Sequence, residues 1–345
     1  MMVGNQIRGK REMLARALAW SGTSWLLSRF PASDSLLVLA YHRIGNPDED
    51  LFDPGLFSAT ADEFNEQIAF LKRKMSVVTL EEALEVVNGT AKDKSRRARV
   101  LITFDDGYLD NYQTVFPILR SHGVQGLFFL ATGMVGSAHV PWWDQIAFLL
   151  KTARLRTFTL EYPARLKVDL DEDGLDGSLR SVLRLFKRPD NSDHSRFLSD
   201  LAERTRGDDP ASASRRFLDW DEAREMIAGG MAIGSHTHSH QLLSQLDGGQ
   251  QREELSKSRA ILEERLGTAV DVIAYPVGAT DSFTDETQRI AQELGYRAGL
   301  SHHGGTNLPG QIDRFDIKRH SIGSQSWNRF KVQAAVCKRT GRYWP

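Results

Sequence analysis

Two adjacent carboxylates form the first candidate site in the chain. Asp105 and Asp106 follow an apolar run over residues 100–104 and stand directly before Gly107. Neighbouring carboxylates repel one another unless a positive charge lies beside or between them. A bound metal ion would relieve this repulsion, with one acid holding the ion and the other acting on the attacking water. An Asp beside a Gly before a helical pattern could equally cap a helix, so the pair alone leaves both interpretations open.

A histidine cluster supplies the other half of a metal site. His236, His238 and His240 follow a second apolar run, at residues 231–234. One helical turn would bring His236 and His240 to the same side, a spacing that suits two imidazole ligands of one divalent metal ion. We expect His238 to point elsewhere and to form an ordinary hydrogen bond. Together with the acid pair, two histidines and one carboxylate predict a hydrolytic metal centre with open coordination positions.

The composition limits which metal ligands are available. The chain has 345 residues with a single cysteine, Cys337, and 10 histidines, so an internal disulfide and a cysteine-rich zinc site are both excluded. A zinc enzyme of this sequence must take its ligands from histidines and carboxylates. The 44 Lys and Arg nearly balance the 45 Asp and Glu, for a formal net charge of −1. That balance argues against a nucleic-acid partner bound through bulk positive charge.

Short apolar runs alternate with helical patterns from residue 36 onward and must position these side chains. The runs are β-branched or aromatic, as is typical of buried parallel strands. The repeated alternation predicts a mainly parallel α/β fold, and seven or eight such units favour a barrel over an open sheet. In such a barrel the chemistry lies at the C-terminal ends of the strands, where both clusters fall. The expected strands are 36–41, 76–79, 100–104, 125–131, 231–234, 270–275 and 296–300.

Helix boundaries can be predicted at several points between these strands. Thr60 with Glu63, and Thr79 with Glu82, have the spacing of capping boxes, which begin helices. A stripe of leucines at helical spacing ends at Gly267, a typical residue type just after a helix. These signals place helices between successive strands, as the α/β interpretation requires.

Three segments fall outside the regular alternation. Residues from about 151 to 215 are charged and Ser-rich, which indicates a partly helical insertion in the barrel. Residues 1–35 predict an N-terminal amphipathic helix. This helix could pack on the domain or lie, through residues 8–30, on an anionic membrane surface. Residues 331–345 are expected to form a C-terminal tail.

The N-terminal segment also bears on the location of the protein. Basic residues precede an apolar stretch, as in a signal peptide, but Arg16 interrupts the apolar part and no clean cleavage site follows. The sequence contains no run of about 18 apolar residues. We therefore expect a cytoplasmic protein that could associate peripherally with a membrane. The oligomeric state stays open.

Three motifs resemble those of the polysaccharide deacetylases, which form carbohydrate esterase family four, or the nodulation-protein-B homology domain. Thr103–Gly107 resembles the first motif of the family, and His236–His240 resembles the second, His-Ser/Thr-any-any-His. Ala274–Gly278 is similar to the third-motif region of the exopolysaccharide-type members. The resemblance extends over residues 36–330. It implies one deacetylase domain with a distorted (β/α)7 barrel, interrupted by the insertion.

The resemblance also implies a function. The protein would be a metal-dependent hydrolase that removes N-acetyl groups from N-acetylhexosamine residues of a poly- or oligosaccharide. Asp106, His236 and His240 would bind the metal ion, with zinc expected, and Asp105 would be the general base. The metal ion and a backbone N–H near Tyr275 would stabilise the tetrahedral oxyanion. The partner would be a glycan, which needs no large charged surface.

The sequence departs from the family pattern at two points. The third motif usually places an arginine beside the general base, but residues 272–276 contain none, so Arg319 could replace it from a later strand. The fifth motif usually supplies a general-acid histidine near the C-terminus, and no clean match is found there. His42 ends the apolar strand 36–41, and a circularly permuted barrel would bring it into the missing position.

The general acid and the substrate contacts are the most open assignments. We predict that His42 protonates the leaving amine, with His302 and His320 as competing candidates and a plain hydrogen-bonded histidine as a further alternative. Tyr108 and Trp143 are expected to line the substrate cleft, since aromatic rings match the apolar face of a sugar. The tryptophan could equally be a core residue at a helix start.

Two other functions fit the same motifs. A related amidase could act on a small amide in the cytoplasm, where it needs no secretion signal. A non-catalytic carbohydrate-binding protein could have kept the fold, although the complete set of acidic and histidine residues argues against this. A metalloprotease is not expected, because the sequence contains no His-Glu-any-any-His.

Overall fold

The structure, a computed structural model, describes residues 35–91, 97–208, 215–305, 307–323 and 327–340. Within these residues the chain divides into two compact units. We call the first the barrel unit; apart from the gaps just given, it contains residues 35–45, 57–137 and 217–340. We call the second the helical unit; it contains residues 46–56 and 138–216.

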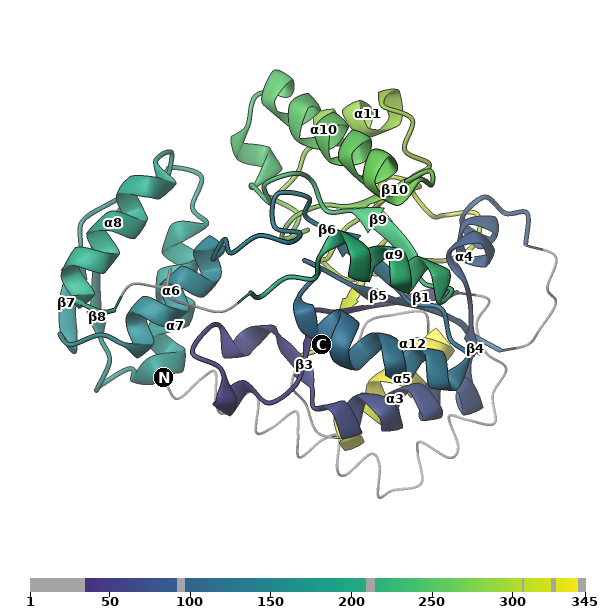
Figure 1. The fold of residues 1–345 in the computed structure, drawn as a ribbon, viewed down its shortest axis with the longest axis horizontal. Coiled ribbons are helices and arrows are strands. Elements are labelled where there is room, and N and C mark those ends of the chain that lie inside the picture. Colours follow the sequence, from purple (N-terminus) through teal and green to yellow (C-terminus); the bar gives the residue numbers. More distant parts are fainter. Residues whose placement is uncertain (1–34, 92–96, 209–214, 306, 324–326, 341–345) are drawn as a thin grey trace. The chain divides into compact units, whose positions relative to one another are not determined.

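A curled parallel sheet forms the centre of the barrel unit (Figure 1). Its strand order is β11–β10–β9–β6–β5–β1–β12, and β4 also pairs with β5. Most of the strands are buried on both faces, which is why their sequences are mainly apolar runs. All seven predicted strands are present, whereas the two-residue β12 has no strand signal of its own. The strands are β1 (Leu36–Tyr41), β4 (Ser76–Val77), β5 (Arg99–Phe104), β6 (Leu127–Leu130), β9 (Ala232–Ser235), β10 (Val272–Ala274), β11 (Ala298–Leu300) and β12 (His320–Ser321).

The sheet closes through the segment that leads into β12. Ile317 forms a parallel bridge with Leu300 of β11, and its N–H donates to the Gly299 carbonyl at 3.0 Å. Three residues later, His320 pairs with Leu39 of β1. One short segment therefore joins the two outer strands, and the predicted distorted (β/α)7 barrel is confirmed. The first strand of the chain lies beside the last.

The strand side chains alternate between two cores, because successive residues of a strand point to opposite faces. Inward-facing side chains such as Val38 and Leu101 pack together with those of helix α4. Outward-facing side chains such as Leu39 and Ile102 pack against the surrounding helices. A residue that continues an inward-facing row past the strand end therefore points over the mouth of the barrel.

Helices lie between successive strands, and several begin or end where predicted. α3 and α4 each begin with the predicted capping box, at Thr60 with Glu63 and at Thr79 with Glu82. Gly267, with a φ of 67°, ends α10 as predicted. The helices are α3 (Ala61–Lys74), α4 (Leu80–Val87), the π-helix η3 (Asn111–Val115), α5 (Phe116–His122), α9 (Trp220–Ala228), η5 (Leu243–Gln245), α10 (Gly248–Leu266), α11 (Asp285–Glu293) and α12 (Trp327–Thr340), and the short strands β2 (Arg43–Ile44) and β3 (Phe57–Ala59) form a separate pair.

The helical unit packs three helices with a two-stranded antiparallel hairpin. Apolar side chains of the three helices form its core, among them Leu150, Phe186 and Phe197. Residues 46–56 belong to the same unit, and the Lys151 ammonium donates to backbone carbonyls of that segment. The elements are η1 (Pro47–Glu49), η2 (Pro54–Leu56), α6 (Trp142–Lys151), β7 (Thr157–Leu160), β8 (Leu166–Asp169), α7 (Gly174–Phe186) and α8 (His194–Thr205).

The predicted flanking segments are placed as follows. The expected insertion, about residues 151–215, falls in the longer segment of the helical unit. That segment begins earlier than expected, at residue 138. The expected helix over residues 1–35, with its membrane contact through residues 8–30, lies outside the described residues except for Ser35. Residues 331–340 of the expected tail belong to α12. A search of the described helices finds none with the length and apolar character needed to cross a membrane.

Candidate active site

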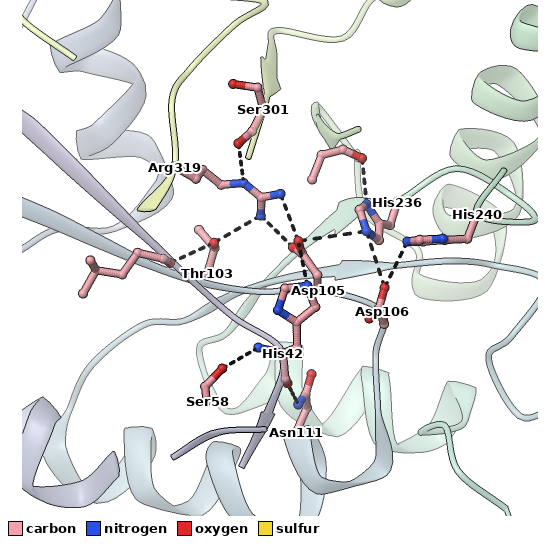
Figure 2. Close-up of polar contacts among 12 residues, drawn as sticks. His42, Ser58, Thr103, Asp105, Asp106, Asn111, His236, His240, Ser301 and Arg319 are labelled. Carbon is pink, nitrogen blue, oxygen red and sulfur yellow. Dashed lines mark hydrogen bonds and ion pairs between the residues drawn. The ribbon is translucent and has the colours of Figure 1, made fainter. Parts of the chain in front are cut away.

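The acid pair ends β5, and its two side chains diverge. Asp105 continues the inward-facing row of Thr103, whereas the next two residues have a left-handed backbone, with φ of 73° at Asp106 and 78° at Gly107. A Cβ at Gly107 would lie 2.7 Å from the Leu130 side chain, so this position accepts only glycine without a shift. Because of this turn the two acids meet different partners (Figure 2).

Asp106 faces the two histidines that follow β9. Its Oδ1 lies 3.2 Å from His240 Nε2 and 3.5 Å from His236 Nε2, and all three side chains are buried. No hydrogen bond of proper geometry reaches this oxygen from the described residues. A buried carboxylate oxygen is costly unless its charge is compensated. Hydrogen bonds from the described residues therefore leave this oxygen uncompensated.

Both kinds of ligand are held in the form that a metal ion requires. His236 Nδ1 lies 2.7 Å from the Ala274 carbonyl oxygen, so Nδ1 must donate and the Nε2 lone pair points towards Asp106. Burial lowers the pKa of His236 to about 4, which keeps the ring neutral at neutral pH. Burial alone would raise the pKa of Asp106, but the adjacent His240 lowers it below its usual value and keeps the carboxylate ionised.

The structure brings the predicted metal ligands Asp106, His236 and His240 together, and they fit a divalent metal ion. Their ligand atoms all lie within 4.8 Å of one another. Two neutral imidazoles and one carboxylate leave a coordination position for water or substrate, as in hydrolytic zinc sites. A cation at this point would compensate the buried Asp106 oxygen.

Asp105 is paired with Arg319. The guanidinium donates to both carboxylate oxygens, from Nη1 to Oδ1 at 2.6 Å and from Nη2 to Oδ2 at 2.9 Å, and such bidentate pairs have fixed geometry. Arg319 is 0% exposed, and its Nε donates to the Ser301 carbonyl at 2.9 Å. Burial raises the pKa of Asp105, but Arg319, His236 and His42 together hold it well below its usual range. Asp105 is therefore an ionised carboxylate in a fixed orientation.

His42 stands beside Asp105 at the mouth of the barrel. Its Nε2 lies 3.9 Å from Asp105 Oδ2, and its side chain is 20% exposed, whereas that of Asp105 is almost fully covered. Two contacts hold its backbone: its N–H donates to Ser58 Oγ at 3.2 Å, and its carbonyl accepts from Asn111 Nδ2 at 2.8 Å (Figure 2). The histidine is thus anchored at its backbone while its ring keeps access to solvent.

The two competing histidines have different surroundings. His302 stacks on His42 with ring centroids 5.5 Å apart, but burial and the charge of Arg319 lower its pKa to about 3. Its ring is therefore uncharged at neutral pH. His320 faces the opposite way, among outward-facing side chains of β1 and α12. The structure brings His42 and His302 to Asp105 and does not bring His320 there.

His42, Asp105 and His302 form a second group whose ligand atoms lie within 4.8 Å of one another. Both oxygens of Asp105 already accept hydrogen bonds from the Arg319 guanidinium. A metal ion in this group would meet that positive charge at close range. The arrangement is better suited to taking up and passing on a proton than to binding a cation.

Two aromatic residues predicted to contact substrate are core residues instead. The N–H of Tyr275 donates to the Leu300 carbonyl at 3.0 Å, so it cannot also bind an oxyanion, and its buried ring stacks on Phe283. Tyr108 is fully buried, with its ring 4.9 Å from that of Phe217. Both assignments are corrected, because position beside a motif does not tell whether a ring faces the cleft or the core.

Trp143 lies in the helical unit and is 5% exposed. Its ring meets that of Trp142 edge-on, at a centroid distance of 5.1 Å, and Trp142 in turn stacks on Phe186 at 4.4 Å. The structure thus places Trp143 among the buried core residues of the helical unit. In the sequence, the apolar residues that follow Trp143 in α6 indicate this core position.

Several residues that support the site carry no signal in the sequence. The Ser301 carbonyl and the Asn111 amide act as described above. Their contacts are set by the tertiary fold, so no local spacing identifies them.

The alternative of a helix cap at the acid pair also fails, because the N-cap of η3 is Asp110. As predicted, His238 forms an ordinary hydrogen bond, to Thr132 Oγ1 at 2.8 Å.

Non-glycine residues with a left-handed backbone gather around the site. Besides Asp106, they are Thr237 (φ 64°), His240 (φ 57°) and Val277 (φ 62°). This conformation is unfavourable for residues with a side chain, and most of all for a β-branched one such as Val277. Such strain persists where the surrounding structure imposes it, and it concentrates at functional sites.

Comparisons with known proteins agree with this geometry. The family model described as polysaccharide deacetylase matches residues 92–299, more than half of the chain. YxkH of Bacillus subtilis, which carries the name of the same family, is 22% identical over 293 residues, covering 85% of this chain and 71% of YxkH.

Solved structures show the same fold. The Streptococcus pyogenes deacetylase PplD, in complex with acetate, is 18% identical with a TM-score of 0.56, covering 88% of this chain and 98% of PplD. IcaB from Ammonifex degensii is 20% identical with a TM-score of 0.55 and the same coverage of both chains. A de-N-acetylase from Aggregatibacter actinomycetemcomitans is 17% identical with a TM-score of 0.53, covering 87% and 99%. With the family match, the chain belongs to the polysaccharide deacetylase family of hydrolases.

Proposed function

We propose that this protein is a metal-dependent deacetylase that removes N-acetyl groups from N-acetylhexosamine residues of a poly- or oligosaccharide. The division of the acid pair carries the proposal. Asp106 faces two histidine ligands, while Asp105 is held by Arg319 beside His42. One carboxylate is thus prepared for a cation, with Zn²⁺ expected, and the other for proton transfer. The names of the solved deacetylase and de-N-acetylase relatives support the same reaction class.

The base is Asp105. When bound, a divalent zinc ion supplies Lewis-acid chemistry, which polarises the acetyl carbonyl and makes water easier to deprotonate. Asp105 accepts the proton of the attacking water as the new C–O bond forms. Its two hydrogen bonds from Arg319 lower its basicity, but they keep it ionised and aligned.

The acid is His42. Cleavage of the amide breaks the C–N bond, and the departing nitrogen must gain a proton to leave as an amine. His42 stands beside the base, with its ring partly open to solvent, so it can reach that nitrogen. His302 is neutral, half-buried and stacked on the His42 ring, which suits it to support the ring and not to supply the proton.

Acetate release tests the proposal. The purified protein should release acetate from N-acetylglucosamine oligomers or polymers, a chelator should stop the release, and added zinc should restore it. Zinc-loaded protein that releases no acetate from any acetylated glycan would contradict the substrate class. Release that continues unchanged in a chelator would contradict the metal dependence. Parallel assays on small amides distinguish a glycan deacetylase from a small-amide hydrolase.

A further inference from the structure

The loop that carries the two histidine ligands has an unfavourable backbone and must be held by other contacts. Thr237 and His240 are both left-handed, with φ of 64° and 57°. Such conformations persist only where the surroundings impose them. The backbone between β9 and η5 is irregular and contains bends, so no helical hydrogen bonds stabilise this loop. The geometry of His236 and His240 therefore depends on what grips this loop.

The carbonyl groups of the loop are held from the end of β6. The Gly133 N–H donates to the His238 carbonyl at 2.7 Å, and the Thr132 N–H donates to the Thr237 carbonyl at 3.2 Å. A Cβ at Gly133 would lie 2.8 Å from the His238 oxygen, so the close approach depends on glycine. These contacts fix one side of the loop.

The amide groups of the loop are held by one carboxylate of α10. Glu254 Oε2 accepts from the His238 N–H at 3.0 Å and from the Ser239 N–H at 2.8 Å, and Oε1 accepts from the Ser239 hydroxyl at 2.6 Å. Glu254 is 9% exposed, so these three hydrogen bonds offset the loss of most of its hydration. One turn along α10, Ser258 Oγ lies 2.9 Å from Ser235 Oγ and grips the start of the loop.

The helix itself has other anchors. Leu255 and Leu262 of α10 are fully buried, and the Gln251 side chain accepts from the Thr287 hydroxyl at 2.6 Å. Loss of the Glu254 carboxylate should therefore leave α10 in place. Loss of the carboxylate would instead free the backbone between His236 and His240.

We propose that Glu254 is a positioning residue for the metal centre, which raises metal affinity by fixing the loop between His236 and His240. The inference rests on the proposed function, because it concerns the metal ligands of that site. Glu254 accepts its hydrogen bonds from two of the three residues between the ligands, His238 and Ser239, and acts mainly through their backbone. Without it, two backbone N–H groups of the loop lose their acceptor, and the ordering of both histidines is deferred until the ion binds.

Zinc affinity tests the role of Glu254 without any need for turnover. Metal-free wild type, Glu254→Ala and Glu254→Gln would be titrated with Zn²⁺ against a chromophoric chelator, and the visible spectrum of the Co²⁺ form recorded. Removal of such supporting contacts typically weakens metal binding 10–100-fold, and this is the loss expected for Glu254→Ala, together with an altered Co²⁺ spectrum. The Gln variant keeps an acceptor for the two N–H groups and should recover most of the affinity. Glu253→Ala, at the exposed neighbouring position, is the matched control and should bind like wild type.

The outcomes separate the positioning role from the metal site. A folded Glu254→Ala protein with wild-type zinc affinity and Co²⁺ spectrum would overturn the role of Glu254 and leave the metal site standing. Wild-type protein that binds no zinc would overturn both. If Glu254→Ala does not fold, Glu254→Asp replaces it, because its shorter side chain cannot reach all three donors. Equal zinc affinity of the Asp and Gln variants would then overturn the proposal.

Discussion

The metal side of the site and its acid–base side are built in different ways. Asp106, His236 and His240 follow two strands, β5 and β9, inside the range matched by the family model. On the acid–base side, Asp105 is joined by His42 after β1 and Arg319 before β12, and both lie outside that range. Yet β5, β1 and β12 are neighbours in the sheet. The metal side rests on local motifs, and the acid–base side rests on closure of the barrel.

This difference implies that the two sides should fail separately. Damage to the histidine loop or to Asp106 should affect metal binding and, through it, turnover. Damage to Asp105, His42 or Arg319 should affect turnover or stability while the metal ligands stay in place. The following experiments test that separation.

Asp106→Asn should have the largest effect. It replaces the only carboxylate of the metal group with a neutral amide, so we expect both bound zinc and acetate release to be lost. Metal content by mass spectrometry and an acetate assay measure the two losses together. Asp62→Asn, on the exposed surface of α3, serves as the control. An Asp106→Asn protein that keeps its full zinc content would show that the ion is held elsewhere.

Asp105→Asn and His42→Ala should keep the metal and lose turnover. Positioned acids and bases typically contribute about 10²–10⁴-fold, which is the expected fall in kcat for each variant. The measurement is kcat for acetate release at verified zinc occupancy. Unchanged turnover in His42→Ala would remove its role as acid. Loss of zinc from that variant would make His42 a ligand and join the two sides of the site.

Arg319→Met should separate stability from catalysis. It leaves Asp105 as a buried carboxylate without its main partner, and breaking a buried pair in this way typically lowers the free energy of unfolding by about 3–5 kcal/mol. Adding Asp105→Asn removes the stranded charge, so the double variant should regain part of that stability without regaining activity. Denaturant unfolding of the two single variants and the double variant measures this. Strictly additive losses would argue against the pair.

His320→Gln should change stability in acid and leave the site untouched. Burial lowers the pKa of His320 to about 4, below the ordinary value of about 6.5, so protonation favours the unfolded chain. Its contribution is complete above pH 6.5 and declines as pH falls through 4, by roughly 3 kcal/mol in the free energy of unfolding. Unfolding curves of wild type and variant should diverge in acid, because only the wild type loses this stability, with kcat at neutral pH unchanged. A changed kcat would place His320 among the site residues after all.

Much of the fold was predictable because the strands of a closed barrel are buried on both faces. Runs such as 36–41 and 100–104 are continuously apolar, and the capping boxes at Thr60 and Thr79 mark the helices between them. β12 was not predictable in the same way. It is two residues long, and its pairing with β1 is decided by the barrel.

The site residues also differ in how far the local sequence predicts them. The proposed metal ligands belong to two short motifs, one at the end of β5 and one at the end of β9, which a sequence displays directly. Arg319 could be suggested only because the third-motif region, residues 272–276, lacks the arginine that the family usually has there. The burial of Tyr108 and the sheet hydrogen bond of Tyr275 depend on Phe217 and Leu300, which are remote in sequence. No local pattern carries that information.

The adjacency of β1 and β12 has a consequence for how the protein is made. Asp105 and Arg319 are 214 positions apart in the chain, and contacts of such separation form late and slowly. During synthesis, β1 leaves the ribosome long before its partner strand exists, so one edge of the unfinished sheet stays exposed. The metal ligands can be complete once β9 and its loop have emerged, whereas the base waits for its guanidinium until β12 arrives. The protein therefore completes the proposed metal side of its site first, and the proposed acid–base side only when β12 is made.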